Sequence, residues 1–150
     1  MSENMSQDPA EVLRSAKNVL LVDWPDQRVP RTLLAAGYNV FGYSPGGYST
    51  AAIAEELSEG QNGFPPRDGE TGFLVFERLE GKLSTIDLVC VYRPEAEHAA
   101  IIEKQVLPFG AKILWLQAPI ASVATAELAG GKGLIFIENT DIAAIGLSIK

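Results

Sequence analysis

Five short apolar runs, separated by segments with helical spacing, constrain the fold of this chain more than any other feature. The run NVLLV at Asn18–Val22 is unbroken, which is typical of a parallel strand that is buried on both faces of a sheet. The strands are expected at Asn18–Asp23, Tyr38–Tyr43, Ile86–Tyr92, Ala111–Leu116 and Leu134–Ile137. Because strands that alternate with helices form parallel sheets with right-handed crossovers, we predict an α/β fold. It is Rossmann-like and doubly wound, with a mostly parallel sheet of about five strands and helices on both faces.

Residues that favour helix starts and helix ends lie between these apolar runs. Asp8 and Pro9 suit a helix cap and a first helical position, and Gly37 suits a helix end. Pro94 also suits a first helical position and is followed by acidic residues, which favour a helix N-terminus. The helices are expected at Pro9–Ala16, Arg28–Ala36, Pro94–Leu107, Ile120–Leu128 and Asn139–Leu147, the last capped by Asn139 or Thr140.

Residues 48–84 interrupt this alternation and are expected to form a variable insertion. Within it, Ser49–Glu56 is compatible with a helix, and Phe73–Glu77 alternates as a strand does. Gly72–Leu83 is therefore expected to be a short hairpin or edge strand, and an edge at Phe73–Phe76 would allow two copies of the chain to pair. Residues 1–7 are expected to be a disordered tail of one domain that spans residues 1–150.

The charge and composition exclude several classes of partner. The net charge is −7, and the 12 Lys and Arg residues form no run, whereas a nucleic-acid-binding protein needs a clustered basic face. No apolar run approaches the roughly 20 residues of a membrane span. The acidic N-terminus does not resemble a signal peptide, and the single cysteine, Cys90, excludes an internal disulfide. A cytoplasmic protein is therefore expected.

Ligands of such a sheet bind beyond the carboxyl ends of the strands, where the strand order reverses. Four turns with polar side chains occupy these positions: Asp23–Arg28, Ser44–Gly47, Arg93–Glu95 and Gln117–Pro119. The first turn lacks glycine and contains two acids, unlike a phosphate-binding loop built from free backbone N–H groups. Asp23 suits a ribose hydroxyl instead, and Trp24 suits stacking on an adenine.

Three motifs carry a resemblance to a known family: Arg93-Pro94-Glu95, Gly110-Ala111-Lys112 and Trp115-Leu116-Gln117. Together with LLAAGYNV at Leu33–Val40, they resemble the CoA-binding domain family, which is similar to the CoA-binding domain of the succinyl-CoA synthetase α subunit. Ser44-Pro45 stands where this family commonly has Asn-Pro. The resemblance implies CoA or acyl-CoA as the ligand. The first loop is divergent, because Asp-Trp-Pro-Asp replaces the family's Gly-Ala-Ser segment.

The crevice rule and the resemblance together define a set of expected ligand contacts. They are Asp23, Trp24, Gln27, Arg28, Ser44, Pro45, Gly46, Arg93, Pro94 and Gln117. No catalytic or metal-binding residue is assigned, because no nucleophile–base pair and no spacing of metal ligands is visible. His98, the only histidine, is expected at a solvated helix position, and Cys90 is expected in the core.

Four of the expected ligand contacts also have purely structural interpretations, and so does Asp26. Asp23 and especially Asp26 suit a helix cap, and Trp24 suits a cover over the edge of the core. Gln117 is equally compatible with ligand contact and with a structural role. Arg93 is equally compatible with ligand contact and with an ion pair to Glu95, Glu97 or Asp87.

The main functional hypothesis is a non-catalytic CoA or acyl-CoA binding protein with its ligand in the crevice. The alternative is a regulatory or structural partner-binding protein whose nucleotide site no longer binds CoA, and the acidic first turn favours it. An enzyme acting on a nucleotide-linked substrate is the weakest hypothesis, because no acid–base pair stands out. The expected partner is a small nucleotide ligand, with a homodimer or another protein partner as a further possibility.

Overall fold

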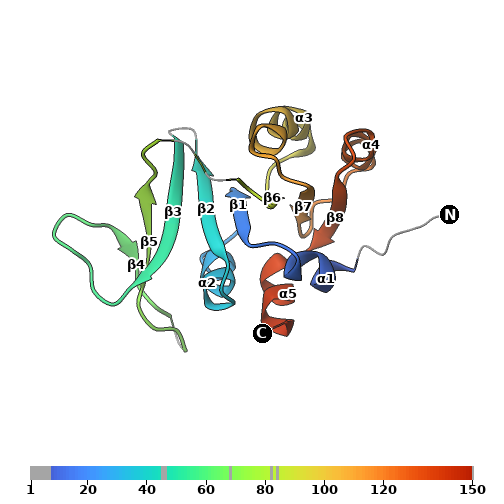
Figure 1. Ribbon diagram of the computed structural model, residues 1–150. Coiled ribbons are helices and arrows are strands. Elements are labelled where there is room, and N and C mark those ends of the chain that lie inside the picture. Colours follow the sequence, from blue (N-terminus) through green and yellow to red (C-terminus); the bar gives the residue numbers. More distant parts are fainter. Residues whose placement is uncertain (1–7, 45–46, 68, 82, 84, 150) are drawn as a thin grey trace.

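A computed structural model describes residues 8–44, 47–67, 69–81, 83 and 85–149 (Figure 1). Across these ranges the chain forms an eight-stranded sheet in the order β4-β5-β3-β2-β1-β6-β7-β8. The strands are β1 Asn18–Val22, β2 Asn39–Ser44, β3 Gly47–Ala54, β4 Gly63–Phe64, β5 Phe73–Arg78, β6 Leu88–Val91, β7 Ile113–Gln117 and β8 Ile135–Thr140. In the described ranges, no helix has the length and apolar character needed to cross a membrane.

The five predicted strands are confirmed as the parallel part of the sheet, β2-β1-β6-β7-β8. The strand order reverses at β1, because β2 lies on one side of it and the later strands lie on the other. The helices are α1 Pro9–Arg14, α2 Arg28–Ala35, α3 His98–Ile101, α4 Val123–Gly131 and α5 Ile142–Ser148. Around α3 the chain is continuously helical, with 3₁₀ turns at Glu95–Glu97 and Leu107–Phe109 and a π turn at Ile102–Val106.

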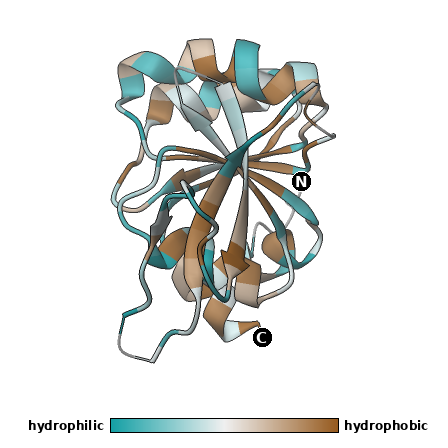
Figure 2. Ribbon diagram, turned by 90° about the vertical axis from the view of Figure 1, so that its left-hand side faces the viewer, coloured by the Kyte–Doolittle hydropathy of each residue, from teal (hydrophilic) through white to brown (hydrophobic). Residues whose placement is uncertain are grey.

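The helices cover both faces of the sheet, which confirms the doubly wound α/β prediction (Figure 1). Side chains alternate along β1, so that Val19 and Leu21 pack with α1, α2 and α5, whereas Leu20 and Val22 pack with α3 and α4. Figure 2 shows the hydrophobic strands between the two helix layers. We call these layers the α5 face and the α3 face.

The insertion differs from its prediction. The helix expected at Ser49–Glu56 is wrong, because Ser49–Ala54 belongs to β3, which pairs antiparallel with both β2 and β5. The ladder hydrogen bonds on both sides of β3 outweigh a weak local helix signal. The expected edge near Phe73–Phe76 is also wrong, since β4 pairs with β5 at Leu74 and Val75 and forms the end of the sheet.

Two helix starts also differ from their predictions, whereas the cap of α1 is confirmed. Asp8 accepts the Glu11 N–H at the start of α1. The helix expected from Ile120 begins at Val123, because the Ser122 hydroxyl accepts the Thr125 N–H. Neither Asn139 nor Thr140 caps α5, because the chain remains in β8 until Thr140 and Asp141 then provides the cap.

Candidate ligand-binding site

A pocket of ≈590 Å³ lies between the carboxyl ends of β1 and β2 and the flank of the α3 segment. It is at the predicted crevice, on the α3 face beside the reversal of strand order. Its lining combines small apolar side chains with charged ones: Val22, Asp23, Tyr43, Ser44, Arg93, Ala96, Glu97, Ala100, Ile101, Lys104 and Gln105. Three predicted ligand residues, Asp23, Ser44 and Arg93, are therefore brought together here.

Arg93 crosses the reversal point and pairs with two carboxylates. Its guanidinium donates to Asp23 Oδ2 at 3.1 Å and to both carboxylate oxygens of Glu97, at 2.9 and 2.7 Å. The hydrogen bonds that Arg93 donates to Glu97 and Asp23 raise the pKa of Arg93, and the hydrogen bond from Arg93 lowers the pKa of Glu97. Of the three expected ion-pair partners, Glu97 is the one that Arg93 contacts, so its positive charge is fully balanced within the pocket.

The divergent first turn begins with an aspartate of unusual backbone geometry. Asp23 has φ 68°, in the left-handed region that favours glycine and that Asp also tolerates. Its Oδ1 accepts the Trp24 N–H at 2.9 Å, which leaves Oδ2 for Arg93. The side chain thus uses one of the N–H groups that a glycine-rich loop would offer to a phosphate.

The remaining residues of this turn support the fold of the α5 face. Trp24 stacks on Phe76 at 5.2 Å between ring centroids, and a Cβ at Gly42 would lie 3.2 Å from its ring. This geometry favours the interpretation of Trp24 as a cover over the core. Asp26 accepts the Arg28 N–H at 2.9 Å and so acts as a cap for α2. Gln27 occupies the N-cap position of α2 without a side-chain capping hydrogen bond.

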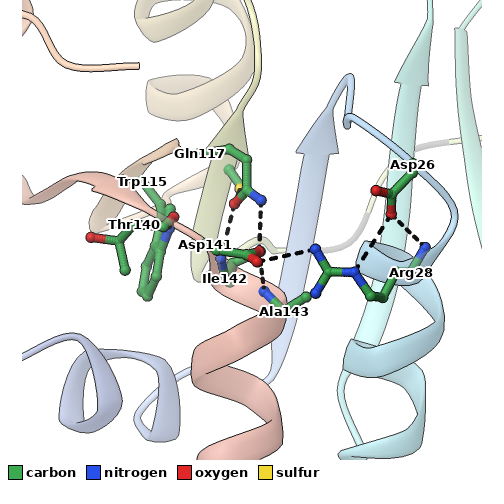
Figure 3. A network of polar contacts seen from close by, with 9 residues as sticks. Asp26, Arg28, Trp115, Gln117, Thr140, Asp141, Ile142 and Ala143 are labelled. Carbon is green, nitrogen blue, oxygen red and sulfur yellow. Dashed lines mark hydrogen bonds and ion pairs between the residues drawn. The ribbon is translucent and has the colours of Figure 1, made fainter. Parts of the chain in front are cut away.

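Arg28 and Gln117 lie on the α5 face, outside the pocket lining, where they converge on Asp141 (Figure 3). Gln117 is 2% exposed, and its Nε2 donates to Asp141 Oδ1 at 2.8 Å, while its Oε1 accepts the Ile142 N–H. Arg28 donates to Asp141 Oδ2 at 3.1 Å. The first turn of α5 is therefore occupied by a carboxylate of the chain itself, where a bound anion would otherwise be favoured.

Burial alone would raise the pKa of Asp141, but its hydrogen bonds outweigh this effect. The bonds from Gln117, Arg28 and the Ala143 N–H hold the pKa of Asp141 below its ordinary value. Cys90 lies close to this network and is confirmed as a buried core residue. Burial raises the pKa of the Cys90 thiol, and the charge of Asp141 raises it further.

The other predicted ligand residues are placed as follows. Pro94 directly precedes the first 3₁₀ turn and accepts the Glu97 N–H, so it starts the helical segment beside the pocket. Pro45 and Gly46 lie outside the described residues. Within the described part of the chain, no three His, Cys, Asp or Glu side chains form a group that could hold a metal ion.

His98 differs most from its prediction, because it is 2% exposed where a solvated position was expected. Its Nε2 lies 2.8 Å from the Arg93 carbonyl and its Nδ1 lies 2.7 Å from the Thr125 hydroxyl. Because a carbonyl only accepts, Nε2 carries the proton. The ring thus joins α3, α4 and the backbone of the pocket arginine.

Replacing His98 with leucine should lower the free energy of unfolding by about 1–3 kcal/mol, because two polar groups lose their partner. Urea denaturation measures the change. Thr125→Ser keeps the hydroxyl and should be much milder than Thr125→Val, which removes it. A His98→Leu variant as stable as the wild type would show that the two hydrogen bonds of His98 do not stabilise the fold.

Glu97, Lys104 and Gln105 are pocket residues that the sequence interpretation did not select. The pocket residues of this segment recur in adjacent pairs at a spacing of four: 96/97, 100/101 and 104/105. This spacing places all three pairs on one flank of a helix. The same spacing is present in the sequence, but these residues lie beyond the four turns at which ligand contacts were predicted.

The fold and the pocket define a doubly wound α/β protein with a ligand-sized cavity at the reversal of strand order. The chain belongs to the CoA binding domain family, whose model matches residues 22–145. This membership confirms the resemblance noted in the sequence. No curated protein matches the chain.

Solved structures with the same fold share little sequence with this chain. A Thermus thermophilus protein, cell-free ID.343, superposes with a TM-score of 0.64 at 17% identity, and the match covers 97% of this chain and 100% of the Thermus chain. Prb, a PH1109 protein redesigned for binding, has a TM-score of 0.65 at 19% identity, over 98% and 94% of the two chains. A hypothetical protein from Pyrococcus horikoshii OT3 has a TM-score of 0.59 at 18% identity, over 99% of both. At these identities the similarity concerns the fold.

Proposed function

We propose that this protein binds CoA or an acyl-CoA in the pocket between the ends of β1 and β2 and the α3 segment. The observation that carries the proposal is the position of this ≈590 Å³ pocket at the reversal of strand order, in a member of the CoA binding domain family. Its volume is within the range of about 300–1,000 Å³ that is usual for small-molecule sites.

The lining offers complementary surfaces to the parts of a nucleotide. Ala96, Ala100 and Ile101 form an apolar flank against which a ring or an acyl chain can pack. Asp23 and Ser44, on the opposite side, offer oxygen atoms to hydroxyl or amide donors. A ligand as long as CoA extends beyond this pocket towards solvent.

Binding without catalysis is proposed because the reactive groups near the pocket are already engaged. Both ring nitrogens of His98 have partners, and Asp23 and Glu97 both pair with Arg93. The Cys90 thiol is buried, and its raised pKa keeps it protonated and a poor nucleophile. These side chains are therefore suited to holding a ligand and not to reacting with it.

Thermal unfolding with CoA, acetyl-CoA, NAD and ATP tests the proposal. A CoA species at a hundred times its dissociation constant should add about 2.7 kcal/mol to the free energy of unfolding. Arg93→Ala leaves the negative charges of Asp23 and Glu97 unbalanced, so it should raise the dissociation constant for CoA by about tenfold or more. Unchanged affinity for CoA in this variant would show that Arg93 does not contribute to binding.

The second candidate is a partner-binding protein with a nucleotide site that no longer functions. It is favoured by the acidic first turn, in which Asp23 uses a backbone N–H and balances Arg93. The absence of a shift with every CoA species at millimolar concentration would replace the first proposal with this one.

A further inference from the structure

The two ends of the pocket differ in their charge balance. At one end, two carboxylates from Asp23 and Glu97 surround the single guanidinium of Arg93. At the other end, Lys104 has no ion pair with any carboxylate in the described part of the chain. The seven-residue step from Glu97 to Lys104 places the two ends about 10 Å apart along the helix. The available positive charge is therefore at the Lys104 end.

A π turn turns this charge towards the pocket. In a regular α-helix, a spacing of four residues drifts by about 40° per step, so the third pair at 104/105 would rotate away from the first pair at 96/97. The π turn at Ile102–Val106 widens the helix where the third pair begins and offsets this drift. Lys104 and Gln105 line the pocket as a result. Single π turns inside α-helices are frequently found at functional sites.

Gln105 adds a buried polar group at the same end. Its side chain is 7% exposed, and its one hydrogen-bond partner among the described residues is the Tyr48 hydroxyl, at a long 3.4 Å. Tyr48 is itself fixed by ring contacts with Tyr43 and Phe109. A buried amide with such a weak contact retains donor capacity for a ligand.

We propose that the Lys104–Gln105 end of the pocket binds the phosphate groups of the ligand, and that Asp23 and Glu97 accept hydrogen bonds from its hydroxyl or amide groups. The inference rests on the proposed CoA function and gives the ligand an orientation. A phosphate at the Arg93 end would meet two carboxylates and would first have to displace them. At the Lys104 end it meets an ammonium group that has no ion pair among the described residues, together with an amide donor.

Calorimetric titration of CoA into the wild type, Lys104→Gln, Lys104→Glu and Lys112→Glu tests this orientation. Lys112 is the matched control, because it is exposed at the amino end of β7 and the change in net charge is the same as in Lys104→Glu. Lys104→Glu should raise the dissociation constant by about tenfold or more, with Lys104→Gln intermediate, because attraction becomes repulsion. Lys112→Glu should stay within about twofold, since solvent and salt screen a distant charge.

Dephospho-CoA and pantetheine separate the sources of the phosphate. If the 3′-phosphate binds at Lys104, the Lys104→Glu variant and the wild type should bind dephospho-CoA equally well. If the diphosphate binds there, the variant should weaken both CoA and dephospho-CoA. In both cases the affinity for pantetheine, which has no phosphate, should be unchanged.

The possible failures are distinguishable. Equal affinities of Lys104→Glu and Lys112→Glu for CoA would overturn the orientation and leave CoA binding intact. Loss of affinity for pantetheine in Lys104→Glu would also overturn it, because the lysine would then act without a phosphate. Absence of CoA binding by the wild type would overturn both this inference and the proposed function.

Discussion

Replacing Trp115 with alanine is expected to lower the free energy of unfolding by about 3–5 kcal/mol, as large-to-small core substitutions of aromatic residues do. Trp115 is completely buried in β7 among the side chains that pack on the α5 face. Its Nε1 also donates to the Thr140 carbonyl at 2.9 Å, which joins β7 to the end of β8. The variant therefore loses both packing and a hydrogen bond. Urea denaturation followed by circular dichroism measures the difference.

Two further substitutions separate these contributions. Trp115→Phe keeps most of the apolar contact but removes the Nε1 hydrogen bond, so the Thr140 carbonyl keeps only the Ala118 N–H, at 3.3 Å. About 0.5–1.5 kcal/mol should therefore be lost. Val123→Ala is the surface control, because Val123 is 79% exposed, and it should change stability by less than about 0.5 kcal/mol. A Trp115→Phe variant with wild-type stability would show that the hydrogen bond to Thr140 contributes nothing.

Replacing Asp141 with alanine should cost about 1–2 kcal/mol at neutral pH, because an N-cap is lost. Asp141 accepts the Ala143 N–H at 3.0 Å, and the same carboxylate binds Gln117 and Arg28. Without it, the buried Nε2 of Gln117 loses its partner. Asp141→Asn is the matched control, since the amide retains an acceptor but has no charge.

The effect of Asp141 should also depend on pH. Its pKa in the folded protein lies below the ordinary value of 3.8, so the unfolded chain binds the proton more readily. The stabilisation is therefore present above the ordinary pKa and is lost as the pH falls through the lower folded pKa. Unfolding at pH 7 and at about pH 3 should show the Asp141→Ala penalty shrinking in acid. An equal penalty at both pH values would contradict a role for the charge.

The parallel part of the sheet was predictable because its strands carry their own signal. A run such as Asn18–Val22 carries apolar side chains on both faces, which is typical of a strand inside a parallel sheet. β3 was not predictable in the same way, since GYSTAAIA is locally ambiguous and becomes a strand through its pairing with β2 and β5. The cap of α5 was missed because two of the partners of Asp141, Gln117 and Arg28, are distant in sequence.

The candidate site was predictable to the extent that strand ends define it. The crevice rule selected Asp23, Ser44 and Arg93, which do line one pocket. The same rule selected Arg28 and Gln117, but it does not predict on which face of the sheet a side chain lies. Both of these side chains lie on the α5 face, away from the pocket. The rule considers only turns, so it did not predict Glu97, Lys104 and Gln105 on the flank of the helix.

The sheet lies between the pocket and two of the groups that stabilise the fold. Trp115 and Asp141 act on the α5 face, whereas Arg93 and Lys104 line the pocket on the α3 face. Substitutions at distant sites without shared partners usually add independently. Changes in stability made at Trp115 or Asp141 are therefore expected to leave the affinity for the ligand unchanged. Natural variation or engineering at these two positions can alter thermal tolerance while ligand preference is preserved.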